Sequence, residues 1–212
     1  MKIPNALQQK LQLRTESNAL RKLPIPTNGI DFSSNDYLGF AKSEEIFDAT
    51  HQYLVDKNIK VNGATGSRLI SGNHNLYTIT EKYIAEFHQS ETALIFNSGY
   101  DANVGFFSAV PQRNDIILYD ELCHASIRDG IQMSHAKSYK LKRFVTLSGV
   151  EVSVYIVTES VFSMDGDTPN METLVSVSEK FKALLVVDEA HALGVFGEKG
   201  EGLMQSQNLQ DK

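Results

Sequence analysis

An apolar run of strand length ends abruptly in two acids and a histidine in the last part of the chain. The run covers 183–187, and Asp188, Glu189 and His191 follow it. Five apolar residues bounded by polar ones are typical of a strand buried on both faces in a parallel sheet. Because α/β proteins bind ligands beyond the carboxyl ends of such strands, Asp188 and His191 are predicted to point into a binding crevice. An acidic strand end followed by a solvated turn is the alternative interpretation.

A second histidine occupies the same kind of position. The run 115–119 is predicted to be a strand, and His124 lies in the stretch that leaves its carboxyl end. A single histidine after a strand is more often structural than catalytic. Two histidines at matching strand ends, together with Asp188, favour a functional site.

Two glycine-containing stretches lie where backbone amides could bind an anion. Gly99 joins a predicted strand, 92–96, to a predicted helix, and amides at such a helix N-terminus can approach a phosphate. The loop 63–74 is dense in glycine, serine and asparagine, and its amides could cradle an anion, with Arg68 available for positive charge. Taken alone, this loop is at least as well interpreted as an ordinary surface loop.

The letters Asp188-Glu189-Ala190-His191 also resemble the magnesium-binding box of a helicase-type ATPase. That interpretation requires a phosphate loop of the form Gly-x-x-x-x-Gly-Lys-Ser/Thr, and the chain contains none. The net charge of −6, from 26 acidic and 20 basic residues, also disfavours a nucleic-acid partner. The helicase hypothesis is therefore rejected.

The composition, 42% apolar and 22% charged, is ordinary for a soluble globular protein. Cys123 is the single cysteine, so an internal disulfide is excluded and a reducing cytoplasm is expected; one cysteine beside His124 is a poor metal site. No apolar run approaches the roughly 18 residues of a membrane span, and the N-terminus has no apolar leader core. We expect a cytoplasmic protein with no metal, membrane or nucleic-acid partner.

Strands and helices alternate along the chain, and the polar candidates always follow a strand. This alternation predicts an α/β fold with a doubly wound parallel sheet. The predicted domains are an N-terminal helix and extended arm, 1–40, and a large domain, 41–212. The predicted strands are 30–33, 92–96, 115–119, 152–158 and 183–187. The predicted helices are 5–20, one capped by Ser43 with Ile46, Ala49, Tyr53 and Leu54 buried, one spaced by Leu76, Ile79, Tyr83 and Phe87, one after Gly99, and 173–182.

Several stretches, taken in order, resemble the α-oxoamine synthases, which are pyridoxal-phosphate enzymes of fold type I. The resemblance rests on 32–39, 63–74, 96–100, 120–130, 158–167 and 187–197. It implies the large domain of that fold, a mostly parallel sheet with flanking helices that is incomplete at the C-terminus. It further implies pyridoxal phosphate as cofactor, an amino acid and an acyl thioester as substrates, loss of carbon dioxide, and a homodimer for the complete protein.

The resemblance assigns roles to the candidate residues at the cofactor ring. Asp188 is implied to pair with the pyridine nitrogen and keep it protonated, so that the ring can accept electrons. His124 is implied to stack on the ring face. His191 is implied to hydrogen-bond the phenolic oxygen, with Ser163 nearby.

The resemblance also assigns the phosphate and substrate contacts. The amides of Gly99 and Tyr100 are implied to hold the phosphate. The loop Gly66-Ser67-Arg68 is implied to lie at a dimer interface and help complete the partner's site, and Arg21 and Asn35 are candidates for contacting the thioester. Within the family, the form of 33–39 is most similar to members that join L-alanine to a pimeloyl thioester in biotin synthesis. A glycine-using C-acetyltransferase is the alternative.

Two departures from the family pattern lead to a third hypothesis. The family's cofactor-binding lysine follows the Asp188 and His191 pair in a Ser/Thr-rich segment, and neither Lys199 nor Lys212 has such surroundings. The segment 140–154 lacks the family's Lys-His-Asn-Asp motif and looks shortened. The chain is therefore expected to be an amino-terminal portion, without the C-terminal part and small domain, and to be inactive alone.

Overall fold

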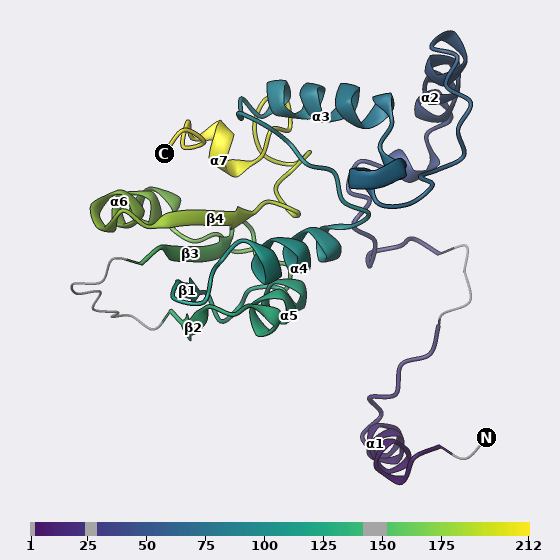
Figure 1. The fold of residues 1–212 in the computed structure, drawn as a ribbon. Coiled ribbons are helices and arrows are strands. Elements are labelled where there is room, and N and C mark those ends of the chain that lie inside the picture. The colour runs from purple at the N-terminus through teal and green to yellow at the C-terminus, as the bar shows by residue number, and fades with distance from the viewer. Residues whose placement is uncertain (1–2, 24–28, 142–151) are drawn as a thin grey trace. The chain divides into compact units, whose positions relative to one another are not determined.

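The computed structural model describes residues 3–23, 29–141 and 152–212 (Figure 1). The chain divides into two units, Met1–Ser34 and Asn35–Lys212. The domain boundary predicted after residue 40 stays a prediction. The altered segment 140–154 falls largely on 142–151, which lies outside the described residues.

The first unit contains one helix, α1 (Asn5–Glu16), in its described residues. Pro4 precedes the helix, and the helix ends before Asn18, which has a positive φ of 53°, so it is shorter than the predicted 5–20. The predicted strand 30–33 is wrong. The carboxylate of Asp31 accepts the amide of Ser33 at 2.8 Å, and this local turn takes the place of a strand ladder.

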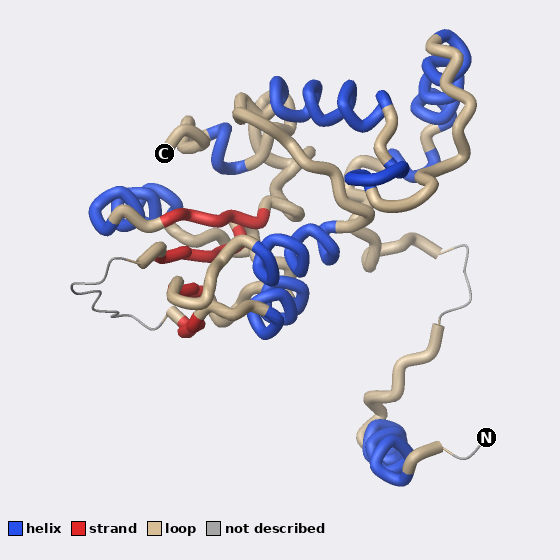
Figure 2. Tube along the Cα trace, viewed as in Figure 1, coloured by secondary structure: helices blue, strands red, loops and turns tan. Residues whose placement is uncertain are grey.

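A parallel sheet of four strands forms the centre of the second unit, in the order β2-β1-β3-β4 (Figure 2). The strands are β1 (Ile116–Tyr119), β2 (Lys137–Lys140), β3 (Val154–Glu159) and β4 (Leu184–Asp188). All three neighbouring pairs are parallel, and Glu159 lies opposite Asp188 in the register of β3 and β4. The predicted parallel α/β fold is confirmed.

Burial follows the position of each strand in the sheet. β3 is central and every one of its residues is buried. β4 is an edge strand in the described part of the chain, so it is half-buried and Leu184 is 52% exposed, which differs from the burial predicted for 183–187. β2, at the other edge, is exposed throughout. Its sequence, Lys-Ser-Tyr-Lys, carries no apolar strand pattern, and it was therefore not predicted.

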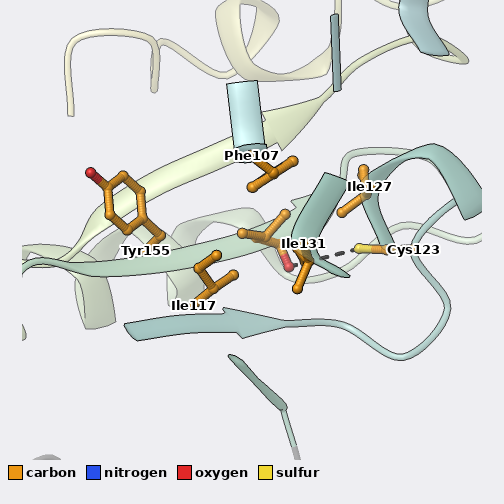
Figure 3. Close-up of a cluster of buried hydrophobic side chains, with 7 residues drawn as sticks. Phe107, Ile117, Cys123, Ile127, Ile131 and Tyr155 are labelled. Carbon is orange, nitrogen blue, oxygen red and sulfur yellow. Dashed lines mark hydrogen bonds between the residues drawn. The ribbon is translucent and has the colours of Figure 1, made fainter. Parts of the chain in front are cut away.

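Helices cover both faces of the sheet (Figure 1). They are α4 (Gly99–Ala109) and α5 (Ala125–Met133) on one face, and α6 (Met171–Phe181) and α7 (Leu203–Ser206) on the other. The first face buries a cluster that includes Phe107, Ile117 and Ile127 (Figure 3). Val186 packs against this cluster, while its neighbour Val187 packs against the cluster of α6 and α7, as expected for alternating side chains of a strand.

Before α4 the structure has the two helices that were predicted and two short helical turns that were not. They are η1 (Phe40–Lys42), α2 (Glu44–Asp56), the π-helical turn η2 (Arg68–Gly72) and α3 (Asn75–Phe87). Ser43 caps α2 as predicted, accepting the amide of Ile46 at 3.2 Å. The predicted buried face of α2 is wrong, because no residue of α2 is buried. Ile46, Ala49 and Tyr53 are exposed, and Leu54 is half-buried.

The apolar segment 92–96 is not a strand, although its composition predicts one. No described strand pairs with it, and Leu94 is largely exposed. The amide of Ile95 donates instead to Glu81 Oε1 at 3.0 Å, a side-chain acceptor on α3. Strand formation requires a neighbouring ladder as well as suitable residues.

Candidate active site

The carboxyl ends of β1, β3 and β4 meet at one edge of the sheet, because the three strands are parallel. Glu159 and Asp188 end β3 and β4 in register there, and the residues after β1 lead to His124. The predicted position of Asp188 and His124 at this edge is thereby observed. The site is built from side chains that α4 and α5 hold against the same edge.

Asp188 is oriented by hydrogen bonds to both of its carboxylate oxygens. Its Oδ1 accepts the amide of Ala190 at 2.9 Å, and its Oδ2 accepts Asn103 Nδ2 at 2.8 Å. The side chain is half-buried. Each oxygen still has a lone pair, so the carboxylate can accept a further N–H donor from a ligand.

His124 is the N-cap residue of α5, and its ring is fixed by the first turn of that helix. Its Nδ1 accepts the amide of Ser126 at 3.2 Å and lies 2.8 Å from Ser126 Oγ. Its backbone amide donates to the carboxyl of Glu159. The residue is exposed, so the ring can be reached by a ligand.

Asn103 and Ser126 connect these two functional candidates. Asn103 Nδ2 donates both to Asp188 Oδ2 and, at 3.0 Å, to Ser126 Oγ, which in turn contacts His124. We call these four residues the polar row. Sequence reasoning missed Asn103 and Ser126; the available signal was the position of Asn103 one helical turn after Gly99, on the same face of α4.

Glu159 is a buried carboxyl beside the polar row. Only 3% of the residue is exposed, and burial raises the pKa of its carboxyl above the ordinary value. The amide of His124 opposes this shift, and the nearby charge of Asp188 adds to it. Glu159 therefore serves first as an acceptor that fixes the backbone at His124.

His191 lies on the other side of the site, with Tyr37. Its Nδ1 and the hydroxyl of Tyr37 are 2.7 Å apart, within hydrogen-bond distance. Both residues line an open cavity of about 430 Å³, and Ser163 lines the same cavity. The other walls are mostly apolar and include Phe162 and Val195. The structure thus places His191 and Ser163 on one cavity, together with Tyr37, which the sequence analysis did not single out.

The N-terminus of α4 has the geometry of an anion site. Ser98 Oγ accepts the amide of Asp101 at 3.0 Å, which leaves the amides of Gly99 and Tyr100 as the first two donors without an intrahelical acceptor. The hydroxyl of Tyr100 donates to Asp129 at 2.7 Å, and this hydrogen bond raises the pKa of Tyr100. Asn103 of the polar row follows Gly99 one turn further along the same helix.

The loop Gly66-Ser67-Arg68 differs from its prediction in one respect. The guanidinium of Arg68 makes a bidentate pair with Glu81, at 2.5 and 2.9 Å, and lies 4.2 Å from the ring centroid of Tyr77. Its charge is therefore paired within the chain and is not available to an anion held by this loop. A role for the loop in a partner's site stays a prediction.

The remaining candidates are two proposed thioester contacts and two lysines. Arg21 belongs to the first unit and Asn35 to the second, and their predicted thioester contacts stay predictions. Lys199 and Lys212 are exposed. Among the described residues, no cluster of histidine, cysteine, aspartate or glutamate could hold a metal ion, and no described helix is long and apolar enough to cross a membrane.

Curated relatives of this chain are named 8-amino-7-oxononanoate synthases. A putative 8-amino-7-oxononanoate synthase of Methanococcus vannielii is 39% identical over 208 residues, covering 94% of this chain and 55% of the relative. The 8-amino-7-oxononanoate synthase 2 of Bacillus subtilis (strain 168) is 37% identical, over 95% of this chain and 56% of the relative. The resemblance inferred from the sequence is confirmed, and the chain spans little more than half the length of these relatives.

Solved structures give the same fold. An 8-amino-7-oxononanoate synthase from Francisella tularensis has a TM-score of 0.66 and 28% identity, covering 85% of this chain and 50% of that chain. A serine palmitoyltransferase from S. paucimobilis with a bound PLP-myriocin aldimine has a TM-score of 0.79 at 24% identity, over 97% and 58% of the two chains. Residues 27–210 match the family described as aminotransferase class I and II, and the chain belongs to that family.

Proposed function

We propose that the carboxyl edge of the sheet holds pyridoxal phosphate and that the complete protein is a decarboxylating acyltransferase. The observation that carries the proposal is the polar row, which places an oriented carboxylate, Asp188, and an oriented imidazole, His124, at one site. The relatives' names and the PLP-bound neighbour support it.

The residues present fit the chemistry of that cofactor. Asp188 offers a free lone pair on a fixed carboxylate, which suits a protonated ring nitrogen. His124 offers an exposed ring whose orientation is set by Ser126. The two free amides at the start of α4, those of Gly99 and Tyr100, suit a phosphate group.

The chain's own residues then have separable tasks. Bound pyridoxal phosphate supplies an electron sink for negative charge at the substrate α-carbon. Asp188 holds a proton at the ring nitrogen, and His124 lies against the ring face. His191 and Ser163 bind the phenolic oxygen, and Tyr37 fixes the ring of His191 through its Nδ1.

The substrates follow the names of the relatives. We propose L-alanine and a pimeloyl thioester, carried by coenzyme A or a carrier protein, with 8-amino-7-oxononanoate as the product in biotin synthesis. The α-carbon of the amino acid gives up its proton and bonds to the thioester carbonyl, and the thiolate leaves and takes up a proton. The carboxyl group then leaves as carbon dioxide, and the α-carbon takes up a proton in its place. The apolar walls of the cavity beside His191 are compatible with an acyl chain.

The 212-residue chain alone is proposed to bind the cofactor without completing this reaction. Neither Lys199 nor Lys212 lines the cavity, and both are exposed. A covalent anchor for the cofactor is therefore expected from another part of a longer protein. Turnover of alanine and pimeloyl thioester by the purified 212-residue chain would contradict this proposal.

The test is a pyridoxal-phosphate titration of the chain and of Asp188→Asn, followed by absorbance of the cofactor. A hydrogen bond to a charged group contributes about 1.5–3 kcal/mol, so Asp188→Asn should weaken binding roughly 10- to 100-fold. Asp48→Asn makes the same change at an exposed position of α2 and should leave binding unchanged. Equal affinity of the parent chain and Asp188→Asn, or no binding by the parent chain, would overturn the proposed cofactor site.

Borohydride reduction of the mixture tests the missing anchor. Reduction fixes any imine between the cofactor and a lysine, and the modified peptides can then be mapped by mass spectrometry. Scattered labelling well below one equivalent is expected. One full equivalent on Lys199 or Lys212 would show that the chain contains its own anchor.

A further inference from the structure

The side chain of Asn103 uses both of its N–H groups inside the site. Its nitrogen lies 2.8 Å from Asp188 Oδ2 and 3.0 Å from Ser126 Oγ, and an amide nitrogen carries two hydrogens, one for each acceptor. The reverse amide orientation would place two oxygens against each other at Asp188. The orientation is therefore fixed by its neighbours.

The direction of the next hydrogen bond follows. Ser126 Oγ accepts from Asn103, so its own hydrogen is free to point to His124 Nδ1, 2.8 Å away. The amide of Ser126 also donates to that nitrogen, at 3.2 Å. Two donors at Nδ1 require it to be an acceptor, so the ring proton of neutral His124 lies on Nε2.

The packing of α4 against α5 keeps Asn103 in place. A Cβ added at Gly130 of α5 would lie 2.8 Å from the carbonyl oxygen of Asn103, so the two backbones are in close contact there. Ser126 is 1% exposed and is held on α5 by the same contact. Neither partner of the Asn103 to Ser126 bond can move away without opening the helix pair.

We propose that Asn103 is a positioning residue that orients the Asp188 carboxylate and, through the Ser126 hydroxyl, directs the second of the two donors that fix the tautomer of His124. This inference rests on the proposed function for its purpose, because the two residues it joins are the proposed ring contacts. A single side chain on α4 thereby sets a carboxylate on β4 and an imidazole on α5 at the same time. The hydrogen-bond arrangement itself is present in the chain without a ligand.

Nuclear magnetic resonance of the 212-residue chain tests the arrangement directly. Side-chain ¹⁵N shifts of histidine distinguish a protonated from an accepting ring nitrogen, and the ¹³C shift of the carboxyl group reports on Asp188. At pH 8 the parent chain should show His124 Nδ1 as an acceptor and Nε2 protonated. The Asp188→Asn spectrum identifies the carboxyl signal.

Four variants, one of them a control, separate the two branches of the polar row. Asn103→Asp keeps the shape but has no N–H to donate, so the Ser126 hydroxyl turns toward the new carboxylate, and the signals of both His124 and Asp188 should shift. Ser126→Ala should shift His124 only. Ser108→Ala, on α4 and hydrogen-bonded to the Gly105 carbonyl within the same helix, should shift neither. Asn103→Ala repeats the first test without adding a charge.

The outcomes test separately the hydrogen-bond arrangement around Asn103 and its role in binding pyridoxal phosphate. A protonated Nδ1 on His124 in the parent chain, or unchanged His124 and Asp188 signals in both Asn103 variants, would overturn the inference. Asn103→Ala should also weaken pyridoxal-phosphate binding about 10-fold. If the parent chain binds no pyridoxal phosphate while the resonance shifts follow the expected pattern, the proposed function fails and the assignment to Asn103 stands.

Discussion

Replacing Gly130 by alanine should destabilise the folded chain, because the added methyl group crowds the contact between α4 and α5. The gain from removing a flexible glycine from a helix is smaller than this cost. The added Cβ would lie 2.8 Å from the carbonyl oxygen of Asn103, 3.0 Å from Phe107 Cβ and 3.0 Å from Val104 Cα. Two of these three atoms belong to the backbone, and none is the end of a flexible side chain. The strain can be relieved only by moving the helices apart.

The magnitude follows from two opposing effects on the free energy of unfolding. Overpacking of a core costs about 1–3 kcal/mol. Because the crowded atoms at Gly130 belong mostly to the backbone and cannot easily move, we expect a cost of about 3 kcal/mol for Gly130→Ala. Alanine is better than glycine in a helix interior by about 1 kcal/mol. The net destabilisation is about 2 kcal/mol, which corresponds to a fall of about 4–8 °C in Tm for a domain of this size.

Thermal unfolding followed by circular dichroism measures this fall, with Gly99→Ala as the matched control. A Cβ at Gly99 meets nothing within 4 Å, so the control should stay within about 0.5 kcal/mol of the parent chain. A Tm for Gly130→Ala equal to that of the parent chain would refute the close approach of α4 and α5. An equal fall in both variants would show that the helix contact is not the cause.

Two further predictions concern titratable groups. The hydrogen bond from Arg68, with that from the Ile95 amide, lowers the pKa of Glu81 from 4.5 to about 2. The lowered pKa stabilises the folded chain above pH 4.5, and this stabilisation is lost as the pH falls toward 2. The difference in the free energy of unfolding between the parent chain and Arg68→Ala should therefore shrink over that range. A difference that stays constant with pH would contradict the prediction. Burial raises the pKa of Cys123 to about 12, so a thiol reagent at pH 8 should label it only after unfolding, and rapid labelling of the folded chain would contradict its burial.

The sheet could be predicted from the sequence where burial alone decides the structure. β1 and β3 are apolar runs of strand length that lie in the middle of the sheet, and the predicted strands 115–119 and 152–158 agree with them to within a few residues. The segment 92–96 has the same composition but no described neighbour to pair with, so composition alone predicted it wrongly. Pairing depends on a partner that a local pattern does not reveal.

The candidate site shows the same division between local and long-range information. Asp188 and His124 could be predicted because one ends an apolar strand and the other comes shortly after one, which is a local feature. Asn103 and Ser126 could not, because their role depends on α4 lying beside α5, and the bond from Asn103 to Asp188 joins residues 85 positions apart. The charge of Arg68 was likewise assigned to a ligand because its partner, Glu81, lies on the next helix.

Stability and site geometry are coupled through one helix contact. The polar row runs from β4 through α4 to α5, and the same two helices bury Phe107 and Ile127 against the sheet. Asn103 contributes its side chain to the site and its carbonyl to the close approach at Gly130. A change that separates α4 from α5 by a few tenths of an ångström lengthens the bond from Asn103 to Ser126 before it exposes the core. Site geometry should therefore be lost at milder conditions than the fold, and the ring signals of His124 should shift before the helices unfold.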